Sequence, residues 1–173
     1  MHEITGDNIN LVKENMLKGK TPRESQVEMT ELVLPNDTNL LGNLLGGKLM
    51  HWIDIAGAMA ASRHSNRVVA TVAVDSLDFR HPARMGELVT LKAKLTWVGR
   101  TSMEVTVNVY AENVKTGAII KTNKAYMTFV ALDDEGKPTP VPPLIPETDE
   151  EKEDYLKAEK RRNERLARKA RGY

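Results

Sequence analysis

The chain carries the sequence LMHWIDIAGAMAA at residues 49–61, an apolar run around a single carboxylate, Asp54. No helix breaker interrupts it from about residue 46 to residue 64, and its apolar residues cover most of a helical wheel. A helix that is apolar on most sides is typically buried rather than amphipathic at the surface. We therefore expect a central helix that other elements wrap, with Asp54 buried in it.

The segments that could wrap this helix follow it directly. Four long runs, 67–79, 87–98, 102–113 and 118–132, are rich in Val, Thr and aromatic residues and alternate with period two or have a β-branched core. Short turns at Gly99-Arg100 and at 115–117 predict hairpins, and 25–34 reads as an earlier strand. The pattern predicts an α+β fold with the helix lying across a curved antiparallel sheet.

Composition limits the function classes. The 173 residues suit one domain with a real core, and the net charge of +1 favours neither nucleic acid nor a membrane surface. The absence of cysteine excludes a disulfide framework and a thiolate nucleophile, and it favours a cytoplasmic location. We expect no membrane insertion, because no segment is long and apolar enough to span a bilayer.

Changes in composition divide the chain into four parts. We expect residues 1–21 to form an N-terminal extension with a short helix, and residues 22–136 to form the globular domain. Residues 137–146 are a proline-rich, extended linker, and 147–173 form a charged C-terminal helix or tail, acidic first and basic last. For the basic run from Lys160 to Arg171, we expect a solvated helix face or a frayed tail rather than contact with a phosphate or a neighbouring subunit.

The segment before the helix supplies groups that suit chemistry beside Asp54. Asn43 brings a neutral amide, and Gly46 and Gly47 let the backbone approach a ligand closely. Taken singly, each has a structural reading: a buried carboxylate that ties helix to loop, a capping Asn, a tight turn. Their combination favours an active site.

The chain resembles the hotdog-fold acyl-CoA thioesterases, in particular the cytosolic acyl-CoA hydrolase branch, over roughly residues 24–132. The matching elements occur in order: Gly42-Asn43, Gly46-Gly47, Asp54, Ala56-Gly57, Arg63-His64, the segment from Val74-Asp75 to Phe79, the Val98–Val105 hairpin and the final strand 125–132. The resemblance implies a hotdog fold, acyl-CoA as substrate, a homodimer as minimum unit and a trimer of dimers as the expected assembly. No cofactor is implied beyond the coenzyme A of the substrate.

Thioester hydrolysis needs an activated water and a stabilised oxyanion. Asp54 suits a general base, or a nucleophile that would form a mixed anhydride, and the sequence leaves both open. The helix N-terminus at Gly46 and Gly47 offers backbone N–H groups to the carbonyl oxygen. The resemblance implies that Asn43 faces Asp54 of the partner subunit, which would make the site composite.

Coenzyme A also needs basic groups for its phosphates. The best candidates lie in the turn Gly99-Arg100-Thr101-Ser102, near which family members bind CoA, and Lys124 and Arg80 are weaker ones. We expect no metal, because the four histidines lack the spacing of a ligand set. His51 reads as a packing or hydrogen-bonding residue.

Three other functions compete with hydrolysis. A hotdog hydratase or dehydratase would want a histidine where Asn43 stands. A non-catalytic acyl-CoA sensor would bind without turnover, usually beside a DNA-binding domain, and no helix-turn-helix is visible. An RNA-binding role for the basic tail lacks the interleaved aromatic residues that such surfaces use, so we expect no nucleic acid partner.

Overall fold

The computed structural model describes residues 18–172, so most of the N-terminal extension, with its predicted short helix, lies outside the described residues. A single five-stranded antiparallel sheet has the strand order β1-β3-β4-β5-β2. The strands are β1 Val27–Leu32, β2 Val68–Leu77, β3 Leu88–Val98, β4 Ser102–Glu112 and β5 Ile119–Leu132. All five predicted strands are confirmed, with ends that differ by at most two residues.

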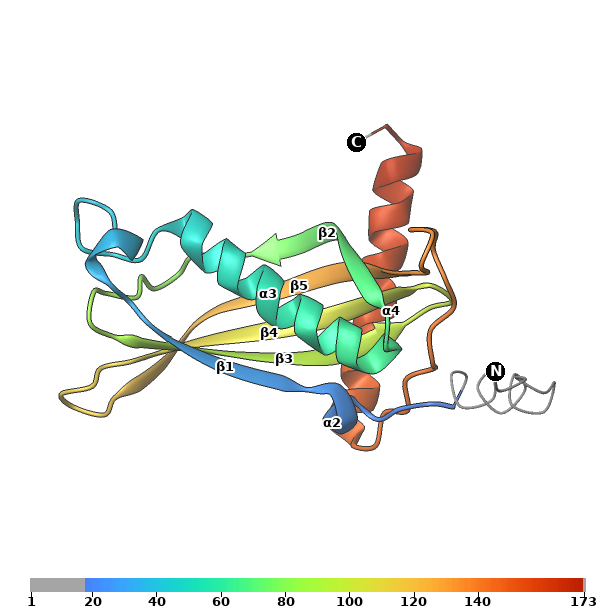
Figure 1. Ribbon diagram of the computed structural model, residues 1–173, viewed down its shortest axis with the longest axis horizontal. Helices are drawn as coiled ribbons and strands as arrows, with labels where there is room; N and C mark the ends of the chain where they lie inside the picture. The colour runs from blue at the N-terminus through green and yellow to red at the C-terminus, as the bar shows by residue number, and fades with distance from the viewer. Residues whose placement is uncertain (1–17, 173) are drawn as a thin grey trace, which may run out of the picture.

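The central helix α3, Gly46–Ser65, lies across one face of the sheet (Figure 1). Strand residues alternate between two faces, and the fully buried valines and leucines of β3 and β4 face α3: Val89, Leu91, Leu95, Val105, Val107 and Val109. The helix ends at Asn66, which adopts a left-handed conformation with φ 53°. This is the predicted α+β hotdog arrangement.

The exposed side of α3 differs from the expectation of a wholly buried helix. Its sheet-facing residues, such as Ile53 and Ala56, are buried, but Ile55 and Met59 are 37% and 40% exposed. Asp54 is half-buried rather than buried. The reason is geometric, because a helix laid on one face of one sheet keeps a side that the same chain does not cover.

The C-terminal helix α4, Asp149–Ala170, crosses the opposite face of the sheet (Figure 1). Its N-terminus is capped by Thr148, whose hydroxyl accepts the N–H of Glu151 at 3.1 Å. Arg161 and Arg165 reach carboxylates of the sheet, Glu104 and Asp75, at 2.7 and 2.6 Å. The expectation of a solvated face or frayed tail is therefore wrong for this side of the helix.

The proline-rich segment is extended, as predicted, and it is bound along its length. Val141 donates its N–H to the carbonyl of Arg100 at 3.0 Å, and Val141 and Leu144 belong to the buried core. The carbonyl of Pro142 lies 2.7 Å from Nε2 of His64, which is fully buried near the C-terminus of α3. The segment thus fastens one end of the helix to the sheet. That the four parts are separate units stays a prediction.

The remaining short elements, α2 Pro22–Ser25 and the 3-10 helix η1 Pro35–Asp37, flank β1. Asp37 is buried, accepts the N–H of Leu34 at 3.0 Å and lies 3.4 Å from the ammonium of Lys48. Its carbonyl accepts the N–H of Leu45, the residue just before α3. The 3-10 helix therefore fixes where α3 begins.

Candidate active site

Asp54 lies in the third turn of α3 and faces the edge strand β2. The hydroxyl of Thr71 donates a 2.6 Å hydrogen bond to Oδ1 of Asp54. A charge-assisted bond of this length orients the carboxylate. The sequence did not predict Thr71 as a site residue, because no local signal distinguishes a mid-strand Thr before the strand is placed beside the helix.

The loop before α3 is held in one conformation by its own amide and by a second loop. Oδ1 of Asn39 accepts the backbone N–H groups of Leu41 and Asn43 at 2.9 and 3.2 Å. The N–H of Leu44 donates to Ala83 at 2.7 Å, and the N–H of Met85 donates to the carbonyl of Gly42 at 2.9 Å. The loop is therefore anchored at both sides.

Within this loop the two asparagines differ. The Asn43 backbone is bonded on both sides to Asn39, and its side chain is partly buried at the edge of a cavity. Asn39 is exposed, and because its carboxamide oxygen is already occupied, its NH₂ group is the part that can donate outward. Asn39 was not among the predicted site residues, although an Asn in an Asp-Thr-Asn loop is a recognisable turn signal.

The N-terminus of α3 presents the backbone groups that the two glycines suggested. Within residues 18–172, no side chain caps this helix end. A Cβ on Gly47 would meet nothing within 4 Å, whereas one on Gly46 would lie 3.4 Å from the ring of Phe79. At Gly47 there is therefore room for a ligand to approach the first turn of the helix, where the positive end of the helix dipole lies.

Within one chain these groups do not meet Asp54. Eight residues of helix separate Gly46 from Asp54, which at 1.5 Å per residue is about 12 Å along the axis. Asn43 and Asn39 lie still earlier in the chain. The structure therefore brings Asp54 together with Thr71, and the asparagines together with the helix N-terminus, as two separate halves.

The predicted CoA-binding residues also form two groups. In the turn from Gly99 to Ser102, the Gly99 N–H donates to Ser102 at 2.8 Å, and a Cβ on Gly99 would lie 2.5 Å from the ring of Trp97. Arg100 is exposed and Thr101 and Ser102 are partly exposed. Glycine is thus required where the indole covers the turn.

Arg80 and Lys124 lie at the other end of the sheet, around a hollow of about 410 Å³ that Lys121 also lines. Lys124 is six residues before Val130, the partner of Ser102, so about 20 Å of strand separate the two groups. Arg80 pairs with Asp78 at 2.5 Å, and this hydrogen bond raises the pKa of the guanidinium.

The side chain of His51 is exposed on α3, so its packing or hydrogen-bonding role stays a prediction. Among residues 18–172, no group of three or more His, Cys, Asp or Glu side chains could hold a metal ion. Nor does any helix in this part of the chain have the length and apolarity to cross a membrane.

Comparison with known proteins places this geometry in a family. Residues 41–118 match the model of the thioesterase superfamily. An acyl-CoA thioester hydrolase of Bacillus subtilis, YkhA, is 45% identical over 147 residues, which are 85% of this chain and 86% of that protein. This chain belongs to the hotdog-fold acyl-CoA thioester hydrolases.

Solved structures agree. The thioesterase superposes on the acyl-CoA hydrolase of Bacillus cereus with a TM-score of 0.85 and 42% identity, over 89% of this chain and 94% of that one. The Staphylococcus aureus acyl-CoA hydrolase, solved with butyryl coenzyme A and coenzyme A, superposes with a TM-score of 0.82 and 38% sequence identity. The match covers 88% of this chain and 93% of that one. Structures of that enzyme also include three alanine variants, of one Asp, one Asn and one Thr.

Proposed function

We propose that this thioesterase hydrolyses acyl-CoA at a composite site, in which Asp54 of one copy faces the helix N-terminus and loop of another. The observation that carries the proposal is the separation of the two halves. A general base must come within about 3 Å of its water, and Asp54 lies much farther than that from the helix amides of its own chain. A second copy can supply them.

The surface around Asp54 suits such a second copy. Strand β2 is an edge of the sheet, and an unpaired strand edge can add another strand. Val72 and Val74 on β2 are 56% and 39% exposed, and the exposed Ile55 and Met59 of α3 are also apolar. A hexameric acyl-CoA thioesterase 42% identical to this chain supports a trimer of dimers as the full assembly.

Each residue then has a defined chemical role. Asp54, oriented by Thr71, removes a proton from water as it attacks the thioester carbonyl, and the CoA thiolate leaves. The Gly46 and Gly47 N–H groups of the other copy stabilise the oxyanion, since such a donor is worth about 3 kcal/mol of barrier. Direct attack by Asp54, through a mixed anhydride, is the alternative that the same geometry permits.

Spacing favours Asn39 over Asn43 as the amide that contacts the substrate. In the Staphylococcus aureus enzyme, the substituted Asn precedes the substituted Asp by 15 residues, and the substituted Thr follows that Asp by 17. Positions 39, 54 and 71 of this chain are Asn, Asp and Thr with the same two spacings. The NH₂ group of Asn39 would donate to the carbonyl, while Asn43 would shape the loop.

Thiol release from acyl-CoA by four variants tests these roles. We expect Asp54→Asn to lower kcat by at least about 10³-fold, and Asn39→Ala by about 10²-fold with KM little changed, because each acts mainly in the transition state. Asn43→Ala should lower kcat less than Asn39→Ala, and Thr71→Val should retain part of the activity. Full activity of Asp54→Asn would overturn the mechanism.

Mixing experiments test the composite site. Asp54→Asn and Asn39→Ala are each expected to be nearly inactive alone. Exchange of subunits between the two would create sites with both native residues, so activity should return to about a quarter of wild type in a dimer assembled at random. No recovery after demonstrated exchange would place both residues in one chain's site. A cytoplasmic location and independence from any cofactor stay predictions.

A further inference from the structure

A cavity of about 290 Å³ opens beside the two asparagines and leads inward from the N-terminus of α3. Its lining combines loop and strand side chains that are polar with core side chains that are apolar. The polar ones are Asn39, Asn43, His81, Thr122 and Asn123, and the apolar ones include Leu44, Leu49, Val89 and Val109. Leu49, Val89 and Val109 are buried residues of the core. A hollow that has amides at Asn39 and Asn43 and apolar core residues beside them suits an acyl chain whose carbonyl stays at the two asparagines.

We propose that this cavity holds the acyl chain and that its size limits the preferred substrates to medium-chain acyl-CoA. The inference rests on the proposed function, because that function places the thioester carbonyl at Asn39 and the first turn of α3. A volume of about 290 Å³ equals roughly ten water-sized units of about 30 Å³. A methylene group is of similar size, so the cavity accommodates about eight to ten carbons.

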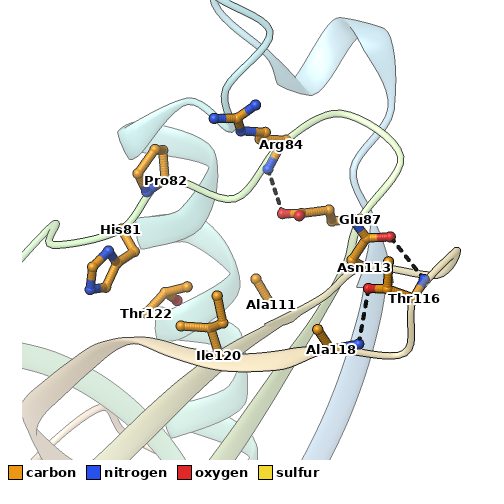
Figure 2. A pocket seen from close by; sticks show the side chains of 10 residues that line it. All are labelled: His81, Pro82, Arg84, Glu87, Ala111, Asn113, Thr116, Ala118, Ile120 and Thr122. Carbon is orange, nitrogen blue, oxygen red and sulfur yellow. Dashed lines mark hydrogen bonds between the residues drawn. The ribbon is translucent and has the colours of Figure 1, made fainter.

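A second hollow adjoins the cavity. This neighbour, of about 310 Å³, shares His81, Pro82 and Thr122 with the first. Figure 2 shows it, with His81 and Pro82 on the loop before β3 and Thr122 and Ile120 on β5. The rim of the second hollow is polar, with Arg84 and Glu87 on one side and Asn113 and Thr116 on the other.

Thr122 is the residue on which the division depends. It is 4% exposed, and its hydroxyl donates to the carbonyl of Val109 at 3.3 Å. Because Thr122 lines both hollows, it lies where they adjoin. Shortening this side chain would join the two spaces and admit a longer chain.

Ala83 offers the opposite change. It is 7% exposed and lines only the first of the two hollows, and its backbone carbonyl already holds the N–H of Leu44. Leucine at this position would add three carbons to the cavity and displace about three methylene groups of the substrate. Each buried methylene is worth roughly fourfold in binding.

The test is kcat/KM for a series of straight-chain acyl-CoA from acetyl to palmitoyl. Wild type should prefer octanoyl- or decanoyl-CoA and decline by tetradecanoyl-CoA. Ala83→Leu should lower kcat/KM for decanoyl-CoA at least tenfold and leave butyryl-CoA within about twofold. Thr122→Ala should raise kcat/KM for tetradecanoyl-CoA at least fivefold.

A double variant supplies the matched control. Ala118 lines only the second hollow, so Ala118→Leu should leave the wild-type profile unchanged but abolish the gain of Thr122→Ala. A profile that neither Ala83→Leu nor Thr122→Ala shifts, with butyryl-CoA still hydrolysed, would overturn the cavity assignment alone. Absence of turnover for every acyl-CoA in wild type would instead refute the proposed function.

Discussion

Replacing Arg161 by alanine should destabilise the protein more than any other single change in the basic part of α4. The guanidinium donates two hydrogen bonds to Glu104, from Nε at 3.1 Å and from Nη2 at 2.7 Å. The hydroxyl of Thr96 donates to the same carboxylate at 2.7 Å. Arg161 also lies over the ring of Tyr126, 3.7 Å from its centroid.

The burial of the Arg161–Glu104 pair determines how much stability Arg161→Ala should cost. The side chains of Arg161 and Glu104 are 20% and 4% exposed. Burial opposes the charge of Arg161, but the hydrogen bond and negative charge of Glu104 outweigh it and raise the pKa of the guanidinium. Removing one partner leaves the other as an uncompensated buried charge, which costs about 3–5 kcal/mol. For a chain of this size that lowers Tm by roughly 6–20 °C.

Lys157 is the matched control on the same helix. It pairs with Glu153 at 2.6 Å, but the two side chains are 59% and 65% exposed, and solvent screening leaves such an exposed pair with little effect on stability. Urea unfolding at one fixed protein concentration, as an oligomer requires, should give a large loss for Arg161→Ala and almost none for Lys157→Ala. Equal losses would refute the buried-pair argument, whereas Arg161→Met with Glu104→Leu should recover most of the stability.

Three further predictions concern α3 and its ends. Gly57→Ala places a Cβ 2.9 Å from the fully buried ring of Phe129, so the free energy of unfolding should fall by about 1–3 kcal/mol. Burial lowers the pKa of His64 in the folded protein, so the unfolded chain binds more protons below about pH 6.5. The free energy of unfolding should therefore fall as the pH decreases through that range. In urea titrations at pH 5 and pH 8, His64→Gln should flatten this pH dependence. Asn66, with φ 53°, should tolerate glycine but lose about 1 kcal/mol as alanine in thermal unfolding.

The elements of the fold were predictable because their signals are local. The run without a breaker predicted a helix from 46 to 64, and α3 spans Gly46–Ser65. Alternation and short turns fixed β3, β4 and β5 within a residue or two. The acidic-to-basic order of the last segment predicted α4, which begins at Asp149 with its own capping box.

The contacts of the site were not predictable in the same way, because they join segments distant in sequence. Thr71 meets Asp54 across 17 residues, and Arg161 meets Glu104 across 57. The sequence around a basic or polar residue does not show whether another element will bury it in the folded protein. Glu104 carried a signal that could have been used, since it is a lone carboxylate within the apolar strand segment MEVTV, and a buried carboxylate needs a partner.

The sequence predicted more burial of Asp54 and of the far side of α3 than the single chain shows, and this difference has a physical reason. A helical wheel shows which side of a helix is apolar, but it does not show whether the same chain or a second chain buries that side. In this structure the stripe through Ile55 and Met59 and the edge strand at Val72 remain exposed, although their residue types suit an interior. A second copy docked on β2 would cover both and bring its loop and helix N-terminus to the half-buried Asp54. The same surface that makes the single chain look incomplete thus supports the composite active site.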